Sequence, residues 1–346
     1  MISVFKHARW GLLLSVLLCG STAESRGQAT NQVLNGLIYG SFEKWTNCLA
    51  LHDREKRYQA VVATDAGARI LHYSYDLLNI LYWNPEANGK TLANARKPFY
   101  LGGYQCDIGP ETQGLPSRPE LSVGQHKWRS PRDFTVDTVS PIDARLGVRL
   151  YKSITIDPDT GELGLMQRLL NVSEDPISYC LWDRTVCKGK GFAFFKRNPK
   201  SRFEHGLSTL RAQGDRFYYE EIDALPENVK TYGDTVVIDT SSGSAKIGAD
   251  TRTGWVAYVL GRLLFIKYFP IDPNGDYADG NNTLEIMWTG TVTELSPLSP
   301  VVRLASGKVY DFPARWMLKP LKREVKSFRD VRKLLDEIDA SPFEEK

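Results

Sequence analysis

The sequence predicts an all-β protein in which one large antiparallel sandwich forms a single domain. More than a dozen short stretches are rich in β-branched and aromatic residues, and many alternate apolar with polar side chains. Turn-forming segments such as Asp157–Gly161 and Asp272–Gly275 separate these stretches. Helical patterns do not alternate with them, which argues against a parallel sheet with crossover helices. The sequence also has no clear internal repeat and no Pro/Ser-rich linker, so we expect one domain over about residues 24–320.

The expected strands follow one another along most of the chain. Their ranges are Tyr58–Thr64, Ala68–Tyr75, Phe134–Val139, Val148–Ile156, Leu163–Leu170, Ile177–Trp182, Phe192–Phe195, Phe217–Ile222, Thr235–Asp239, Trp255–Tyr258, Leu263–Phe269, Thr283–Thr289 and Val301–Leu304. The exception is the tail, residues 321–346, where apolar residues from Val325 to Ile338 form one stripe at helical spacing. Pro320 and Pro342 mark its two ends. We expect an amphipathic C-terminal helix that packs on the sandwich; a partner-binding helix is the alternative.

The first 23 residues have the pattern of a signal peptide. Lys6 and Arg9 precede the short apolar stretch Trp10–Leu18, and the small residues Ser21–Ala23 follow. Nine residues are too few to cross a bilayer, and no later stretch is long and apolar enough, so we expect no membrane span. Cys19 raises the alternative of a lipoprotein, but the bulky residue before it is unfavourable for lipidation. We therefore predict a periplasmic or secreted protein cleaved after residue 23.

Charge and cysteine content narrow the class further. The 346 residues include 44 Lys and Arg against 41 Asp and Glu, a balance too even for an electrostatic nucleic-acid binder. Four cysteines remain beyond the signal peptide, namely Cys48, Cys106, Cys180 and Cys187. The last two could pair across a hairpin in an exported protein, or all four could be buried thiols. The spacing of zinc ligands is absent.

Two segments, and the single residue Glu294 described next, carry side chains suited to binding or catalysis. The loop at Gly102-Gly103 precedes the carboxylates Asp107 and Glu111, which could serve a ligand or simply be solvated acids in a tight turn. Trp182, Asp183 and Arg184 combine an aromatic surface with charged groups, as sugars require, although a Trp–Arg packing pair is the alternative.

Glu294 stands alone in an apolar, strand-like run. A buried carboxylate must be paired or have its pKa raised towards that of a base; a salt bridge to an arginine is the structural alternative. His205 is the histidine nearest to other charges, and the histidines show no spacing typical of metal ligands.

Calcium is the one cofactor that the sequence raises. Asp272, Asn274, Asp276 and Asp279 lie within one polar loop. The EF-hand pattern fails, because its sixth position is tyrosine and its twelfth is threonine. A polar hairpin loop is the better interpretation, and no other cofactor is expected. Nucleotide-binding glycine loops and the nucleophile elbow of serine hydrolases are also absent from the sequence.

The order of several motifs resembles one known superfamily. Thr64–Leu71 followed by Asn79–Tyr82 resembles the opening of galactose-mutarotase-like domains. The segment from Asn84, the Gly102-Gly103 loop, and Glu294-Leu295 with a later Trp316 are similar to an exported branch, the DUF4380 proteins. The resemblance spans about residues 32–318, nearly all of the predicted mature chain.

The resemblance implies a β-supersandwich that binds carbohydrate on one open face. In aldose 1-epimerases of the superfamily, a glutamate takes the proton of the anomeric hydroxyl while a histidine protonates the ring oxygen; Glu294 matches the glutamate. The histidine is missing, because the corresponding loop reads Gly-Gly-Tyr-Gln. We therefore consider Glu294, His205 and Asp107 as catalytic candidates. The substrate-binding candidates are Arg69, Asn84, Tyr104, Glu111, Trp182, Asp183 and Arg184.

The expected function is recognition of a saccharide by an exported monomer. Aldose-1-epimerase-like acid–base chemistry is one possibility; a non-catalytic carbohydrate-binding protein or a lyase-related accessory domain is the alternative. A nucleic-acid partner is not expected.

Overall fold

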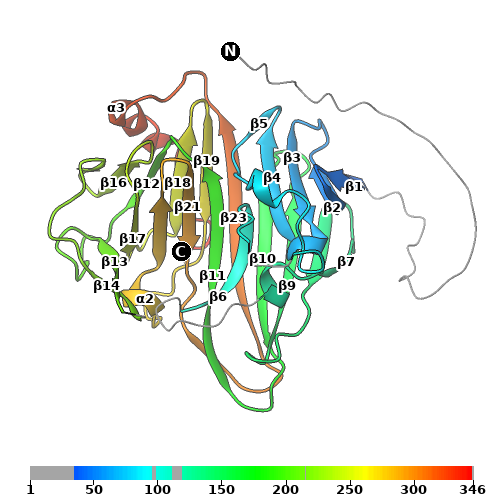
Figure 1. The fold of residues 1–346 in the computed structure, drawn as a ribbon. Coiled ribbons are helices and arrows are strands. Elements are labelled where there is room, and N and C mark those ends of the chain that lie inside the picture. The colour runs from blue at the N-terminus through cyan, green and yellow to red at the C-terminus, as the bar shows by residue number, and fades with distance from the viewer. Residues whose placement is uncertain (1–34, 96–98, 111–118, 215, 345–346) are drawn as a thin grey trace, which may run out of the picture. The chain divides into compact units, whose positions relative to one another are not determined.

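The computed structural model describes residues 35–95, 99–110, 119–214 and 216–344, and these form two large β-sheets (Figure 1). In both sheets, neighbouring strands of the described residues pair antiparallel, as Leu163–Asn171 does with Val148–Ile156. The prediction of an all-β sandwich is therefore confirmed. Within the described residues, no helix is long and apolar enough to cross a membrane. The predicted signal peptide, residues 1–23, lies outside the described residues.

The first sheet, called sheet I here, has 13 strands. In spatial order they are β1 (Leu37–Phe42), β2 (Trp45–His52), β3 (Tyr58–Ala63), β4 (Arg69–Tyr75), β6 (Tyr104–Gly109), β11 (Ile177–Lys188), β21 (Val292–Pro297), β20 (Leu284–Trp288), β17 (Ala245–Ala249), β13 (Ser208–Gln213) and β14 (Arg216–Glu221), with β5 (Leu78–Asn79) beside β4 and β22 (Val302–Leu304) beside β11. The middle of this sheet brings together strands that lie more than 100 residues apart in sequence.

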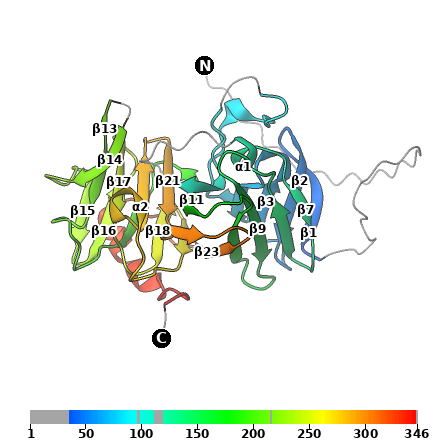
Figure 2. The ribbon, with the colours of Figure 1, turned by 90° about the horizontal axis from the view of Figure 1, so that it is seen from below.

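The second sheet, sheet II, has ten strands. Their spatial order is β15 (Val229–Tyr232), β16 (Thr235–Asp239), β12 (Phe192–Lys196), β18 (Trp255–Leu260), β19 (Leu263–Tyr268), β23 (Val309–Pro320), β10 (Leu163–Asn171), β9 (Val148–Ile156), β8 (Thr135–Val139) and β7 (Lys127–Arg129). Figure 2, seen from below, shows strands of this sheet such as β18 and β23 alongside β21 and β11 of sheet I.

The main core lies between the two sheets. Strand β9 shows how the pattern builds it, because buried and half-buried residues alternate strictly from Val148 to Ile156. At the centre, the ring of Trp316 contacts Tyr104, Phe265 and Tyr73 at centroid distances of 5.2, 5.3 and 6.0 Å. All four side chains are fully buried. These large rings join β4 and β6 of sheet I to β19 and β23 of sheet II.

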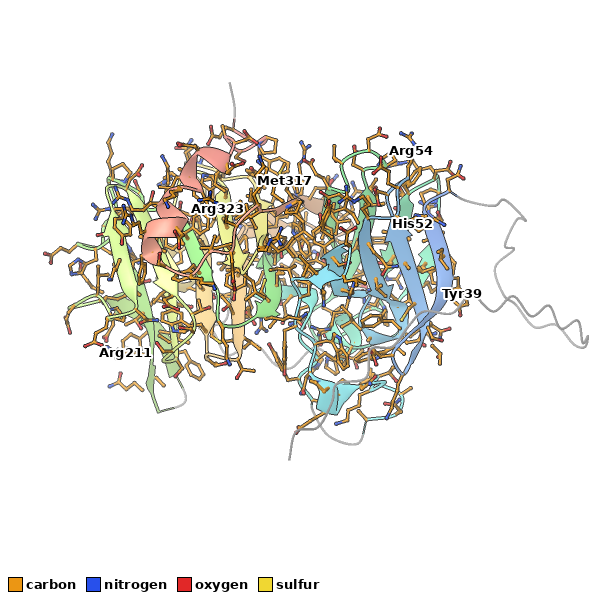
Figure 3. All side chains as sticks on the ribbon, turned by 90° about the horizontal axis from the view of Figure 1, so that it is seen from above. Tyr39, His52, Arg54, Arg211, Met317 and Arg323 are labelled. Carbon is orange, nitrogen blue, oxygen red and sulfur yellow. The ribbon has the colours of Figure 1, made fainter. Side chains whose placement is uncertain are left out.

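The few helical segments are short. They are α1 (Pro119–Ser122), α2 (Ala278–Asn281) and α3 (Phe328–Arg332), with 3₁₀ turns at Thr64–Ala66, Pro85–Ala87 and Leu335–Glu337. The tail thus forms one short helix and a turn where we expected a longer helix. Its apolar stripe is nevertheless placed as predicted: Val331 is fully buried, and Phe328 packs on Phe192 of β12 at 5.5 Å between ring centroids. In Figure 3, seen from above, the labelled Arg323 lies beside this segment.

The cysteines settle one alternative. All four described cysteines are buried and free, so the proposed Cys180–Cys187 disulfide is wrong. Both residues lie on β11, which runs without a turn from Ile177 to Lys188. Seven residues of extended strand separate their backbones by roughly 23 Å, far beyond the reach of a disulfide.

Candidate functional site

Three neighbouring strands of sheet I, β6, β11 and β21, build the candidate site on the face that points away from sheet II. In the register of these strands, Arg184 lies opposite Gln105, and Val186 lies opposite Glu294. Because side chains alternate along a strand, Arg184 and Glu294 share this outer face, while residues 183, 185 and 295 point into the core between the sheets. The register therefore brings the lone acid late in the chain next to an arginine from its middle.

A pocket of about 360 Å³ lies over this part of sheet I. Its lining residues are Arg69, Phe99, Tyr100, Leu101, Gly103, Gln105, Ser122, Val123, Arg184, Val186 and Glu294. The volume falls in the range of small-molecule sites. Of the site residues predicted from sequence, the structure brings Arg69, Arg184 and Glu294 to this one pocket.

An ion pair between Arg184 and Glu294 forms the charged part of the pocket wall. The Nε and Nη2 atoms of Arg184 donate to the two carboxylate oxygens of Glu294 at 2.8 and 3.0 Å, and Ser296 Oγ adds a third hydrogen bond at 3.0 Å. Burial alone would raise the pKa of Glu294, but the charge and hydrogen bonds of Arg184, together with the charge of Lys246, outweigh it and lower the pKa below its ordinary value. Glu294 is therefore an ionised acceptor and a weak base.

Arg69 forms a second cationic wall of the pocket. Its guanidinium donates to the carbonyl oxygens of Gly102 at 2.8 Å and Ser122 at 3.0 Å, and to Oε1 of Gln105. Burial and the nearby charge of Arg184 lower its pKa to about 10, so it remains charged at neutral pH. These bonds tie the loop at Gly102, the end of α1 and strand β6 to strand β4.

Phe99 and Tyr100 supply the aromatic part of the pocket. They precede Gly102 and Gly103, whose φ angles of 78° and 66° favour glycine. A Cβ atom on Gly102 would lie 2.5 Å from the backbone oxygen of Tyr82, and one on Gly103 would lie 2.5 Å from that of Ile70. This close passage holds the aromatic loop against the sheet. Partial loss of hydration at the covered part of its side chain, and the charge of Glu294, raise the pKa of Tyr100, so its hydroxyl stays protonated and can donate a hydrogen bond.

Asp107 lies next to the pocket but not in its lining. Its carboxylate accepts hydrogen bonds from Gln105 Nε2 at 3.2 Å and from the backbone N–H of Ile108 at 3.0 Å, and it lies 3.7 Å from Nη1 of Arg184. Asp107 therefore supports Arg184 from the side opposite Glu294.

Trp182 is adjacent to this cluster and almost entirely covered, with 5% of its surface exposed. The guanidinium of Arg184 and the ammonium of Lys246 lie over its ring at 4.3 and 4.5 Å. Lys246 in turn pairs with the buried Glu285 at 3.1 Å. With both cations over its ring, Trp182 orients Arg184 and is not an open platform for a sugar.

Two predicted binding residues lie in the core. Asp183 is fully buried and pairs with Lys267 of β19 at 2.7 Å. Tyr104 is fully buried between the sheets against Trp316. Both predictions fail for the same reason, since strand alternation turns these side chains away from the face that carries Arg184.

Two other predicted residues, Asn84 and His205, are not among the residues that line the pocket. Asn84 caps the 3₁₀ turn Pro85–Ala87, because its Oδ1 accepts the N–H of Glu86 at 3.1 Å. His205 is half-buried in the connection between β12 and β13 and does not line the pocket. Glu111 lies outside the described residues.

The loop considered for calcium is organised by its own hydrogen bonds. Asp272 Oδ1 accepts the N–H of Asn274 at 2.9 Å, and Asn281 Oδ1 accepts the N–H of Tyr277 at 3.1 Å. In the described part of the chain, no three His, Cys, Asp or Glu side chains gather as metal ligands would.

Sequence reasoning missed Phe99, Tyr100 and Gln105 as pocket residues. The only signal was the Gly102-Gly103 pair, which marked the loop but not which of its neighbours would face the pocket. Gln105 could have been inferred from alternation, since it lies two residues before Asp107 on the same face of β6.

Comparisons with known proteins support the fold. No family model matches the sequence, and no curated protein matches it. Among solved structures, a galactose mutarotase-like protein from Clostridium acetobutylicum is similar with a TM-score of 0.55 at 9% identity, covering 82% of this chain and 98% of that one. One from Lactobacillus casei ATCC 334 has a TM-score of 0.53 at 11% identity, covering 78% and 100%. A galactose mutarotase related enzyme from Lactobacillus acidophilus gives 0.53 at 9%, covering 80% and 100%. The chain therefore has the galactose mutarotase-like β-sandwich fold.

Proposed function

We propose that this protein binds a saccharide in the pocket beside Glu294. The observation that carries the proposal is the joint lining of one 360 Å³ pocket by the Arg184–Glu294 ion pair and the aromatic residues Phe99 and Tyr100. Sugar hydroxyls both donate and accept hydrogen bonds, so a fixed carboxylate beside a fixed guanidinium suits them. The apolar C–H face of a sugar ring packs well on an aromatic ring. The fold and its mutarotase-like structural neighbours are consistent with a carbohydrate-related function.

The binding groups need little rearrangement when a ligand arrives. Arg184 is already held by Glu294, Asp107 and the ring of Trp182, and Glu294 by Arg184 and Ser296. Side chains that are ordered before binding lose less conformational freedom on association. Tyr100, with 43% of its surface exposed, is the group most open to a ligand.

A glycan array of neutral and acidic saccharides followed by calorimetry tests the proposal. We expect Tyr100→Ala to weaken the best ligand at least about fivefold, because truncating a central aromatic anchor costs more than about 1 kcal/mol. Trp128→Ala is the matched control: this residue is 41% exposed but lies on β7 of sheet II. Its affinity should equal that of the wild type. Absence of binding to every glycan, or equal losses in both variants, contradicts the proposal.

Aldose-1-epimerase-like chemistry is the second candidate, favoured by the position of Glu294 in the pocket. The low pKa and the three hydrogen bonds of Glu294 weaken it as a base, and no histidine lines the pocket among the residues described. Tyr100 can donate a hydrogen bond to a ring oxygen, but its raised pKa makes it a poor donor of the proton itself. Polarimetry of freshly dissolved α-hexoses tests this: equilibration must be faster with the wild type than with Glu294→Gln, and equal rates end this candidate.

Three further features complete the proposal. The chain is exported with cleavage after Ala23, acts as a monomer, and belongs to the DUF4380 branch of mutarotase-like proteins, on the motifs around Asn84 and Glu294. N-terminal sequencing of the protein from its native host should begin at Glu24, and light scattering should give the monomer mass. A retained signal segment or a stable dimer would overturn these features.

A further inference from the structure

A buried ion pair lies directly behind the Arg184–Glu294 pair, on the opposite face of the same strands. Lys267 of β19 in sheet II reaches across the core and contacts Asp183 of β11 at 2.7 Å. Neither side chain has any exposed surface. Gln167 satisfies the second carboxylate oxygen of Asp183 at 3.1 Å. The pair is therefore sealed in the core, and it cannot touch a ligand in the pocket.

The partners of Lys267 are the residues that flank the two pocket side chains. Its ammonium donates to Thr185 Oγ1 at 2.7 Å and to the carbonyl oxygen of Leu295 at 3.3 Å, besides Asp183. In sequence, residues 183 and 185 enclose Arg184, and residue 295 follows Glu294.

The strand register makes this contact specific. Thr185 of β11 lies opposite Leu295 of β21, and the next pair along the ladder is Val186 with Glu294. A slip by one residue would turn Arg184 or Glu294 into the core. Lys267 is hydrogen-bonded to both strands at the rung next to the pocket. A relative shift of β11 and β21 would therefore not let it keep its bonds to both strands.

Stability alone is a weak explanation for such a pair. Two charges that are taken out of water lose hydration free energy, and their mutual attraction barely offsets that loss. Apolar side chains of similar size often fill such a space with equal or better stability. Specifying one arrangement of the strands is a well-attested role of buried polar groups.

We infer that Lys267 is a positioning residue, which holds β11 and β21 at the spacing and register that let Arg184 and Glu294 pair beside the pocket. The inference rests on the proposed function, because that function assigns ligand binding to the Arg184–Glu294 pair. The geometry that it concerns exists without a ligand. It can therefore be tested in the free protein, independently of whether a saccharide is found.

The experiment is a double-mutant cycle between Arg184→Gln and Glu294→Gln, read by urea unfolding of the full chain. In the wild-type background we expect the two side chains to be coupled by about tenfold or more in the unfolding equilibrium constant. Thr185→Val removes the hydroxyl that accepts from Lys267 at 2.7 Å and donates to Asp183 at 3.4 Å, without changing charge or shape. In that background the coupling should fall at least about threefold.

Thr135→Val is the matched control, because Thr135 is equally buried, lies on β8, and its hydroxyl shares a hydrogen bond with the hydroxyl of Thr155 at 3.0 Å. It should destabilise the protein but leave the coupling unchanged. The combined replacement Lys267→Met and Asp183→Asn should lower the coupling further. Unchanged coupling in Thr185→Val and in the combined variant, or an equal loss in Thr135→Val, would overturn the inference. A failure to bind saccharides would reject the proposed function without altering this result.

Discussion

Replacing Glu294 by glutamine tests the electrostatics of the pocket most sharply. The carboxylate is 2% exposed and accepts three hydrogen bonds, two of them from the guanidinium of Arg184. Glutamine has the same shape, but it keeps only one oxygen and presents an NH₂ group to the remaining donors. Arg184 then keeps the carboxylate of Asp107, whose oxygen lies 3.7 Å away, as a charged neighbour. The change thus removes one partner of a buried pair and leaves the other charge poorly compensated.

The expected loss of stability follows from these contacts. Breaking a buried ion pair on one side costs about 3–5 kcal/mol. The remaining glutamine oxygen can still accept one bond from Arg184, and the arginine is about a quarter exposed, with 24% of its side-chain surface accessible. We therefore expect a loss of about 3 kcal/mol in the free energy of unfolding, measured by urea denaturation with tryptophan fluorescence.

A surface pair of the same geometry provides the control. Arg168 and Asp311 on sheet II are joined by two bonds of 2.6 and 2.7 Å, but their side chains are 47% and 37% exposed. Because water and salt screen such pairs, Asp311→Asn should cost no more than about 1 kcal/mol. If Glu294→Gln costs no more than this control, the argument for a tightly held, buried ion pair is refuted.

Three other predictions concern pH, thiols and the core. The folded pKa of Glu294 lies below its ordinary value of 4.5, so the stabilisation from the ionised carboxylate is complete above pH 4.5 and is lost as pH falls through the folded pKa. The difference in unfolding free energy between wild type and Glu294→Gln should therefore shrink as pH is lowered from about 6 to about 3. A constant difference would contradict the assigned shift. Burial raises the pKa of Cys48 to about 11 and the pKa values of the other described cysteines further. A thiol reagent at about pH 8 should therefore label none of the four until urea unfolds the protein. Rapid labelling of the native protein would show that the thiols are not buried. The hydroxyl of Tyr104 is buried without a hydrogen-bond partner among the described residues. Tyr104→Phe should therefore keep or slightly raise the free energy of unfolding and leave the saccharide affinity measured by calorimetry unchanged. A loss of affinity would restore the predicted binding role of Tyr104.

The strands were predictable because their signal is local. In β9 and β10 the buried face repeats every second residue over nine residues, and the turns between such strands have their own signature. The tail shows the limit of this reasoning. Its apolar stripe indicated burial correctly, but the length of the helix depends on how the segment lies over sheet II, where Phe328 packs on Phe192.

The candidate site was predicted only in part. Glu294 and Arg184 were identified separately, but their pairing joins residues 110 positions apart, and only the register of β11 and β21 creates it. Asp183 was grouped with its neighbours in sequence, although alternation along a strand sends it to the opposite face. Tyr100 lies in an irregular loop without periodicity, so its place in the pocket depends on the tertiary fold alone.

The most direct test of the central claim is a crystal structure of the protein soaked with the saccharide that binds best in the glycan screen. We predict that the sugar ring lies in the pocket against Tyr100, with hydroxyl groups within hydrogen-bond distance of Glu294 and Arg184. A sugar bound elsewhere, for example on the exposed face of sheet II around Tyr151 and Met166, with this pocket empty, would contradict the account.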